Sequence, residues 1–155
     1  MTTSYPSPNP SPQGGGGEPT WKSAAALVGR LIFAGVFIMA AGFKFAGMEM
    51  TADYIASAGF PFSLFLAWVA AIFETLLVIG FLSGAFLSEA ALLAAVYVVF
   101  LGFAFHGASH WGEDQIGQME FGAFVSHFPF AAGLLFAAAF GPGKWAVRKS
   151  ALPLP

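Results

Sequence analysis

Hydrophobic positions along the chain gather into four long runs that are separated by shorter, more polar connections. The runs cover residues 23–45, 61–82, 85–105 and 121–140. Each run is close to the 20 or so apolar residues that a helix needs to cross the hydrocarbon core of a bilayer. The pattern predicts an all-α fold, a bundle of four transmembrane helices.

The connection between the first two runs has a weaker pattern of its own. Within residues 47–61 the apolar density falls, and four positions recur at steps of three and four. These positions are Thr51, Tyr54, Ile55 and Ala58. Such spacing predicts a short helix that lies at the membrane interface, and Gly59 and Pro61 are expected to end it before the second span.

The two ends of the chain differ from the runs between them. Residues 1–21 contain five prolines and four consecutive glycines, a composition that favours a disordered tail. Residues 22–142 form the expected membrane domain, and residues 143–155 form a basic tail.

The basic residues predict the orientation of the spans. Four spans place both ends on one side of the membrane, and five basic residues fall on that side. They are Lys22, Arg30, Lys144, Arg148 and Lys149, whereas Lys44 lies on the opposite side. Because basic residues concentrate in cytoplasmic loops, we expect a multi-pass protein of the plasma or inner membrane with both termini in the cytoplasm.

Composition supports a membrane location and excludes several kinds of function. Hydrophobic residues make up 57% of the chain and charged residues 9%, against about a quarter charged in soluble domains. The lipid bilayer is therefore the first expected partner. The net charge of −2 and the scattered basic residues argue against nucleic-acid binding. The absence of cysteine excludes thiolate chemistry and cysteine-ligated metal clusters.

Two charged residues inside the runs are candidates for function. Glu74 lies near the middle of the second run, where a charge costs about 2.5–3.5 kcal/mol to insert, and Arg30 lies two turns inside the first. We expect Arg30 and Glu74 to pair, either as a structural ion pair or as a functional one that takes up protons or binds a quinone head group. Lys44, at the end of its run, is expected to extend toward the lipid head groups.

A second group of polar residues gathers at the outer side. Its members are Lys44, His106, His110, Glu120 and His127. Hydrogen bonding to water or backbone is the ordinary role of such residues, while a divalent metal site or bis-histidine haem ligation are alternatives that we do not assign. Phe124 lies close to His127 in sequence, so Lys44, His106, His127 and Phe124 are the candidates for holding a quinone. Phenylalanines that simply face lipid are the alternative.

Short motifs along the chain resemble those of the DoxX family. In order they are Gly29-Arg30-Leu31, Gly42-Phe43-Lys44-Phe45, Gly59-Phe60-Pro61, Glu74 followed by Gly80-Phe81-Leu82, Phe105-His106, and Gln118-Met119 leading to Gly133-Leu134-Leu135. The likeness covers residues 29–135. One departure is Ser126-His127, where many members have Lys-Asn, so a role of that pair does not carry over.

The resemblance implies a small four-helix membrane protein that works with membrane or soluble oxidoreductase subunits, as in thiosulfate:quinone oxidoreductase. We therefore expect a subunit that anchors or couples a redox partner to the quinone pool, with quinone as the possible cofactor and Glu74 and Arg30 as its central polar residues. Catalysis by this chain alone is left open, as is a homo-oligomer. The alternatives are a structural or assembly subunit without chemistry and, less favoured, a small-solute transporter.

Overall fold

A computed structural model describes residues 19–147 and 150–152, and every regular element in that part is helical. The elements are α1 (Thr20–Ala46), α2 (Met48–Ser57), α3 (Ser63–Ser83), α4 (Leu87–His106), the 3-10 helix η1 (Ala108–His110) and α5 (Gln115–Phe140). Four helices are long and apolar enough to span a membrane, which confirms the predicted fold class. Most of the predicted N-terminal tail lies outside the described residues, as do Arg148 and Lys149.

The fourth span begins earlier than the hydrophobic run predicts. Helix α5 starts at Gln115 because the carboxylate of Asp114 accepts a hydrogen bond of 2.8 Å from the backbone N–H of Gly117. This side-chain cap satisfies an N–H group that would otherwise lack a partner at the helix start. Glu120, expected in a polar connection, therefore lies on a helix.

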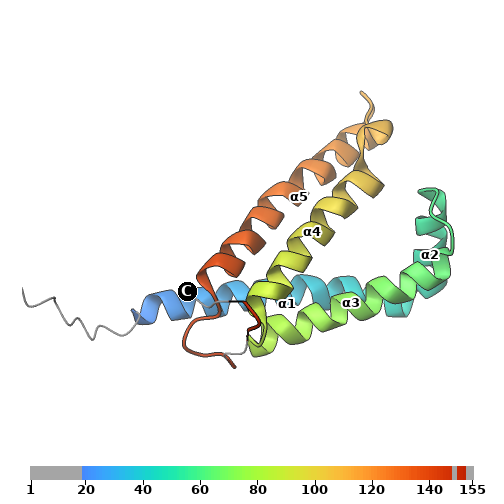
Figure 1. Cartoon of the computed structure of the whole chain (residues 1–155). Helices are drawn as coiled ribbons and strands as arrows, with labels where there is room; N and C mark the ends of the chain where they lie inside the picture. Colours follow the sequence, from blue (N-terminus) through green and yellow to red (C-terminus); the bar gives the residue numbers. More distant parts are fainter. Residues whose placement is uncertain (1–18, 148–149, 153–155) are drawn as a thin grey trace, which may run out of the picture.

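The helices form two arms that diverge from one junction (Figure 1). We call α1, α2 and α3 the first arm and α4 with α5 the second arm. Within the first arm, α1 and α2 both pack against α3, and α4 packs along α5 in the second arm. The arms meet near the turn between α3 and α4, and the C-terminal segment returns to the same junction.

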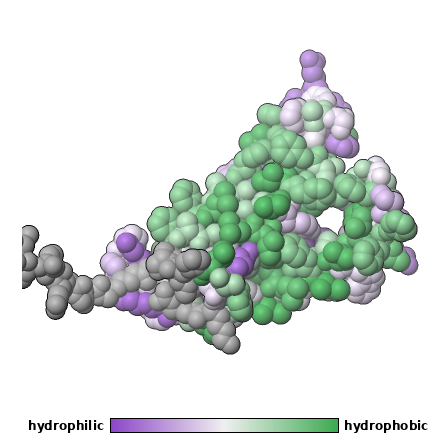
Figure 2. Space-filling view, viewed as in Figure 1, coloured by the Kyte–Doolittle hydropathy of each residue, from purple (hydrophilic) through white to green (hydrophobic). Residues whose placement is uncertain are grey.

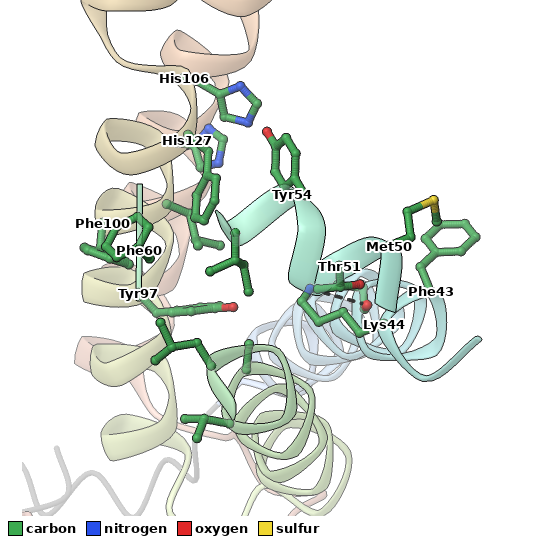
Figure 3. A pocket seen from close by; sticks show the side chains of 17 residues that line it. Phe43, Lys44, Met50, Thr51, Tyr54, Phe60, Tyr97, Phe100, His106 and His127 are labelled. Atoms are coloured by element: carbon green, nitrogen blue, oxygen red, sulfur yellow. Dashed lines mark hydrogen bonds between the residues drawn. The ribbon is translucent and has the colours of Figure 1, made fainter. Parts of the chain in front are cut away.

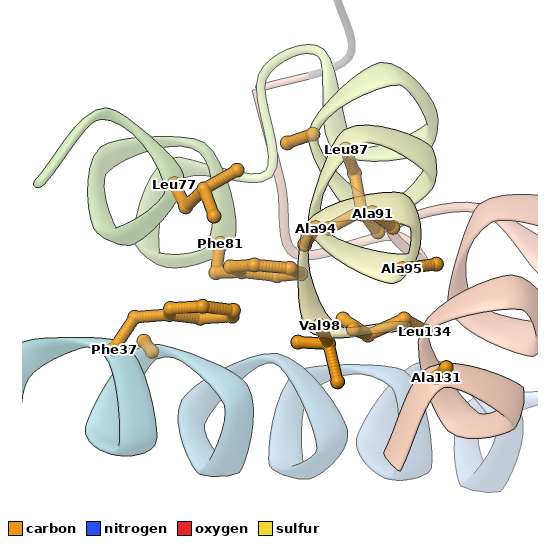
Figure 4. Packing of buried hydrophobic residues seen from close by; sticks show 12 residues of the cluster. Phe37, Leu77, Phe81, Leu87, Ala91, Ala94, Ala95, Val98, Ala131 and Leu134 are labelled. Atoms are coloured by element: carbon orange, nitrogen blue, oxygen red, sulfur yellow. The ribbon is translucent and has the colours of Figure 1, made fainter. Parts of the chain in front are cut away.

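Buried apolar side chains hold the junction together (Figure 4). Phe37 of α1 and Phe81 of α3 stack with nearly parallel rings and centroids 5.8 Å apart. Small residues of α4, including Ala91 and Ala94, are fully buried, which lets the helices approach closely. The core thus lies where the arms join.

The short helix predicted between the first two spans is α2. It packs onto α3 through Ala52 and Ile55, which form a small buried cluster with Ala67. Because α2 lies at the far end of the first arm from the junction, it faces the open space between the arms (Figure 1).

Candidate ligand pocket between the two arms

A pocket with a volume of about 710 Å³ lies between the two arms. Figure 2 shows the opening between the end of the first arm and the second arm, surrounded by mostly hydrophobic surface. Residues from α1, α2, α3, α4 and α5 line it, and most of them are apolar or aromatic. Its polar lining residues are Lys44, Thr51, Tyr54, Tyr97, His106 and His127 (Figure 3). This volume lies within the range of 300–1,000 Å³ that is typical of small-molecule sites.

A three-residue network stands at one end of this pocket. The Nζ atom of Lys44 lies 2.8 Å from Oε1 of Glu74, and the hydroxyl of Tyr97 donates a hydrogen bond of 2.8 Å to the same oxygen. Glu74 is 1% exposed and its Oε2 has no hydrogen-bond partner in the structure, while the Lys44 side chain is 21% exposed. The carboxylate is thus buried, and it holds the Lys44 and Tyr97 side chains that line the pocket.

The predicted pairing of Arg30 with Glu74 is wrong. Arg30 is 3% exposed at the junction, and its guanidinium donates to backbone carbonyls instead of to a carboxylate. The acceptors are Phe81, Leu82, Pro142 and Trp145, at 2.7–3.2 Å. The carbonyls at the end of α3 carry partial negative charge because no further turn of helix uses them, so they suit a buried cation.

The expectation that Lys44 extends to the lipid head groups is wrong as well. Lys44, in the last turn of α1, turns inward to Glu74. Arg30 and Lys44 both contact α3, at different points along it. Glu74 therefore contacts Lys44, near the α2 end of α1, and not Arg30, which lies at the junction.

Histidines and a carboxylate form the other polar end of the pocket. His106 Nδ1 lies 2.6 Å from Oε2 of Glu120, and the ring of His127 lies beside that of His106 with centroids 5.3 Å apart. His127 Nδ1 lies 2.7 Å from the carbonyl oxygen of Ala123, an acceptor, so Nδ1 carries the hydrogen. The two imidazoles line the pocket together (Figure 3).

Tyr54 of α2 closes this end of the pocket from the first arm. Its ring stacks on Phe105 of α4, with centroids 5.1 Å apart. Burial raises the pKa of the Tyr54 hydroxyl above its ordinary value, and the negative charge of Glu120 raises this pKa further. Tyr54 is therefore an uncharged hydrogen-bonding group throughout the neutral pH range.

Two other sequence candidates lie away from the pocket. Phe124 packs edge-on against Phe103, Phe128 and Trp111 in the second arm and does not line the pocket. His110 lies exposed in η1. The structure thus brings Lys44, His106 and His127 to one pocket, but it does not bring Phe124, His110 or Arg30 there.

The alternative of a metal site depends on how its possible ligands are arranged among the described residues. No group of three or more histidine, aspartate or glutamate side chains in these residues is placed to hold a metal ion. His106 is instead hydrogen-bonded to Glu120, and His127 is hydrogen-bonded to the carbonyl of Ala123.

Tyr97 is the site residue that the sequence prediction missed. A tyrosine inside the third apolar run carries a hydroxyl that needs a partner when it is buried, and this signal could have linked it to Glu74. The hydrophobic run around it concealed the signal, because periodicity in an almost wholly apolar helix does not say which face turns inward.

The fold and the pocket define a class of protein: a four-span membrane protein with a buried ion pair beside an apolar cavity. A family model described as DoxX matches residues 25–107, more than half of the chain. The chain therefore belongs to the DoxX family. The match covers α1 to α4, whereas α5, which carries Glu120 and His127, lies beyond it. Searches of curated proteins and of solved structures gave no match.

Proposed function

We propose that this protein binds a membrane quinone in the pocket between its arms and couples an oxidoreductase partner to the quinone pool. The observation that carries the proposal is the pocket itself, which combines an apolar lining with hydrogen-bonding groups at two ends. A quinone has a matching distribution of polar and apolar groups, because its two carbonyl oxygens lie on opposite sides of a ring that carries an apolar chain.

The Lys44 end supports binding of a carbonyl group. An ammonium has three N–H donors, and Lys44 uses one for Glu74 and a longer one, 3.5 Å, for the carbonyl of Ala40. A third donor stays available on a side chain that lines the pocket. Glu74 holds the ammonium in place, so the donor is oriented before the ligand arrives.

The aromatic lining supports binding of the ring and the chain. Phe43, Phe60, Phe100 and Phe105 contribute rings to the pocket wall, with the apolar residues of α3 opposite. Flat aromatic ligands pack well against such rings in offset or edge-on geometry.

The proposed orientation places both termini in the cytoplasm, because the basic residues near the ends outnumber those at the α2 end. In this orientation the histidine end of the pocket lies toward the outer face of the membrane, and the junction lies toward the cytoplasm.

Purification in a mild detergent tests the proposal. Solvent extraction of the purified protein should yield quinone, and titration with decylubiquinone should quench the tryptophan fluorescence with saturation. Lys44→Met should weaken binding about ten- to hundredfold, since a hydrogen bond to a charged group contributes about 1.5–3 kcal/mol. The matched control is Lys22→Met, which removes an exposed lysine at the start of α1.

The outcomes separate the proposal from its main alternative. Co-elution of an oxidoreductase whose quinone reduction per assembled complex falls in the Lys44→Met variant supports coupling. A fall in the abundance of the complex, with unchanged activity per complex, would instead identify an assembly subunit. Purified protein without quinone and without saturable binding would contradict the proposal.

A further inference from the structure

We propose that His106, held by Glu120, is the pocket group that distinguishes quinone from quinol, so that binding of the oxidised form is coupled to uptake of a proton. This inference rests on the proposed function and assigns a role to a pair of residues at the end of the pocket opposite Lys44. It concerns recognition of two redox forms of one ligand.

The geometry of His106 leaves one ring nitrogen for the ligand. Nδ1 is engaged with Oε2 of Glu120 at 2.6 Å, and a carboxylate accepts, so Nδ1 carries a hydrogen. Nε2 is the remaining polar atom of a side chain that lines the pocket. In the neutral imidazole Nε2 accepts a hydrogen bond, whereas in the imidazolium it donates one.

The two redox forms of the ligand require opposite partners at this nitrogen. A quinone carbonyl only accepts, so it needs the imidazolium. A quinol hydroxyl donates, so it pairs with the neutral imidazole. The protonation state of His106 therefore selects the redox form, and histidine is the side chain whose charge changes most readily near neutral pH.

The His106 end of the pocket is accessible to water. The Glu120 side chain is 30% exposed, while that of Glu74 at the other end is 2% exposed. The imidazole itself is 24% exposed and takes up the proton at Nε2, because Nδ1 already carries the hydrogen that it donates to Glu120. The Lys44 end offers a fixed ammonium donor, so it holds a ring oxygen of either form without this selectivity.

Two further titratable side chains lie near the ring of His106. His127 of α5 lies beside it, and Tyr54 of α2 lies across the opening (Figure 3). His127 donates through Nδ1 to the carbonyl of Ala123, whereas Nδ1 of His106 contacts the carboxylate of Glu120. Tyr54 stays neutral in this pH range.

The test measures affinity as a function of pH for both redox forms. Wild-type protein in lipid nanodiscs is titrated with decylubiquinone and, after reduction, with decylubiquinol between pH 5.5 and pH 8.0. We expect quinone affinity to rise about tenfold as the pH falls and quinol affinity to change in the opposite direction, since one charge-assisted hydrogen bond corresponds to about that factor.

Three variants locate the effect. His106→Asn should remove the pH dependence for both forms while leaving saturable binding, and Glu120→Gln should weaken the dependence because the imidazolium loses its counter-charge. His110→Asn is the matched control, since His110 is an exposed histidine outside the pocket and should leave the dependence unchanged. Helical circular dichroism and elution volume establish that each variant is folded.

The possible failures are distinct. Saturable binding with no pH dependence in the wild type would overturn this inference and leave the proposed function standing, and so would a dependence that persists in His106→Asn and disappears in His127→Asn. Failure of wild-type protein to bind either form at any pH would instead overturn the proposed function.

Discussion

The ion pair of Lys44 and Glu74 shows how a single carboxylate is accommodated deep in an apolar helix. Two donors converge on Oε1, one charged and one neutral, so the negative charge is compensated on one side. A buried pair of this kind contributes little net stability compared with apolar residues, but each member is costly to leave alone. The pair therefore has more value as a fixed electrostatic feature of the pocket than as a source of stability.

A double-mutant cycle tests this view of the pair. Lys44→Met should destabilise the protein by about 3–5 kcal/mol because Glu74 is left as a buried charge. Glu74→Gln should cost less, about 1–3 kcal/mol, since the amide can still accept from Tyr97 and the Lys44 side chain is partly exposed. The double variant should cost less than the sum of the two. Unfolding in detergent, followed by circular dichroism, measures all three, and strictly additive losses would show that the two charges do not interact.

At the scale of helices, the approach of α4 to α5 depends on a glycine. A Cβ atom added at Gly102 of α4 would lie 3.2 Å from Cβ and Cγ of His127 on α5. The histidine end of the pocket is thus built on close contact between two helices, as small residues commonly permit in membranes.

Gly102→Ala should therefore act on the pocket more than on folding. The methyl group pushes against His127, and we expect ligand affinity to fall about fivefold, equivalent to one hydrogen bond of about 1 kcal/mol. Gly122→Ala provides the comparison, because a Cβ atom there meets nothing within 4 Å. Titration with decylubiquinone compares the two variants. An equal loss of affinity in both would indicate a general effect of replacing a helical glycine and not displacement of His127.

Arg30 joins elements that come from both arms. Its guanidinium reaches the end of α3 and the segment after α5, and a Cβ atom at Gly84 would lie 2.9 Å from its Cζ. Gly84 also has a φ of +72°, which glycine adopts without strain. The turn between α3 and α4 is thus shaped to admit this side chain.

Arg30→Lys should lower the free energy of unfolding by about 2–4 kcal/mol, because an ammonium on a single atom cannot serve carbonyls spread around a planar guanidinium. Ligand affinity should not change, since Arg30 does not line the pocket. Lys22→Arg, the reverse exchange at an exposed site of α1, should have no effect. Unfolding and ligand titration are measured on the same samples. If Arg30→Lys lowered ligand affinity at unchanged stability, Arg30 would have to be counted among the residues of the candidate site.

At the scale of the whole molecule, the two arms share one junction and leave a pocket between their other ends. The same arrangement puts the end of α5 close to α1, where the backbone N–H of Lys144 donates to the hydroxyl of Ser23. The two ends of the described chain are therefore on one side of the molecule, and η1 lies on the other (Figure 1).

The proposed orientation can be tested because the chain has no cysteine. A single cysteine at Glu113, near η1, should react with a membrane-impermeant maleimide in intact cells, and one at Lys144 should react only after permeabilisation. Labelling in the opposite order would reverse the orientation and would place the histidine end of the pocket toward the cytoplasm.

The spans were predictable from sequence because hydrophobic length alone defines a membrane helix, and α2 was predictable from its spacing. The partner of Glu74 was not. Depth along the membrane favoured Arg30, but the choice between Arg30 and Lys44 depends on the register of α1 against α3, which hydropathy does not encode. The sequence grouped His106, Glu120 and His127 only as polar residues at one side of the membrane, and the contact of His106 with Glu120 depends on the early start of α5 at its Asp114 cap.

The apolar wall of the pocket has a consequence for how tightly a ligand needs to be held. A molecule with a long isoprenoid tail dissolves in the bilayer and is concentrated there by orders of magnitude relative to water. The cavity faces a solvent in which the proposed quinone is already abundant, and lipid acyl chains compete for the same walls. Occupancy is then set by the mole fraction of the ligand in the membrane, so modest intrinsic affinity suffices and exchange can stay fast.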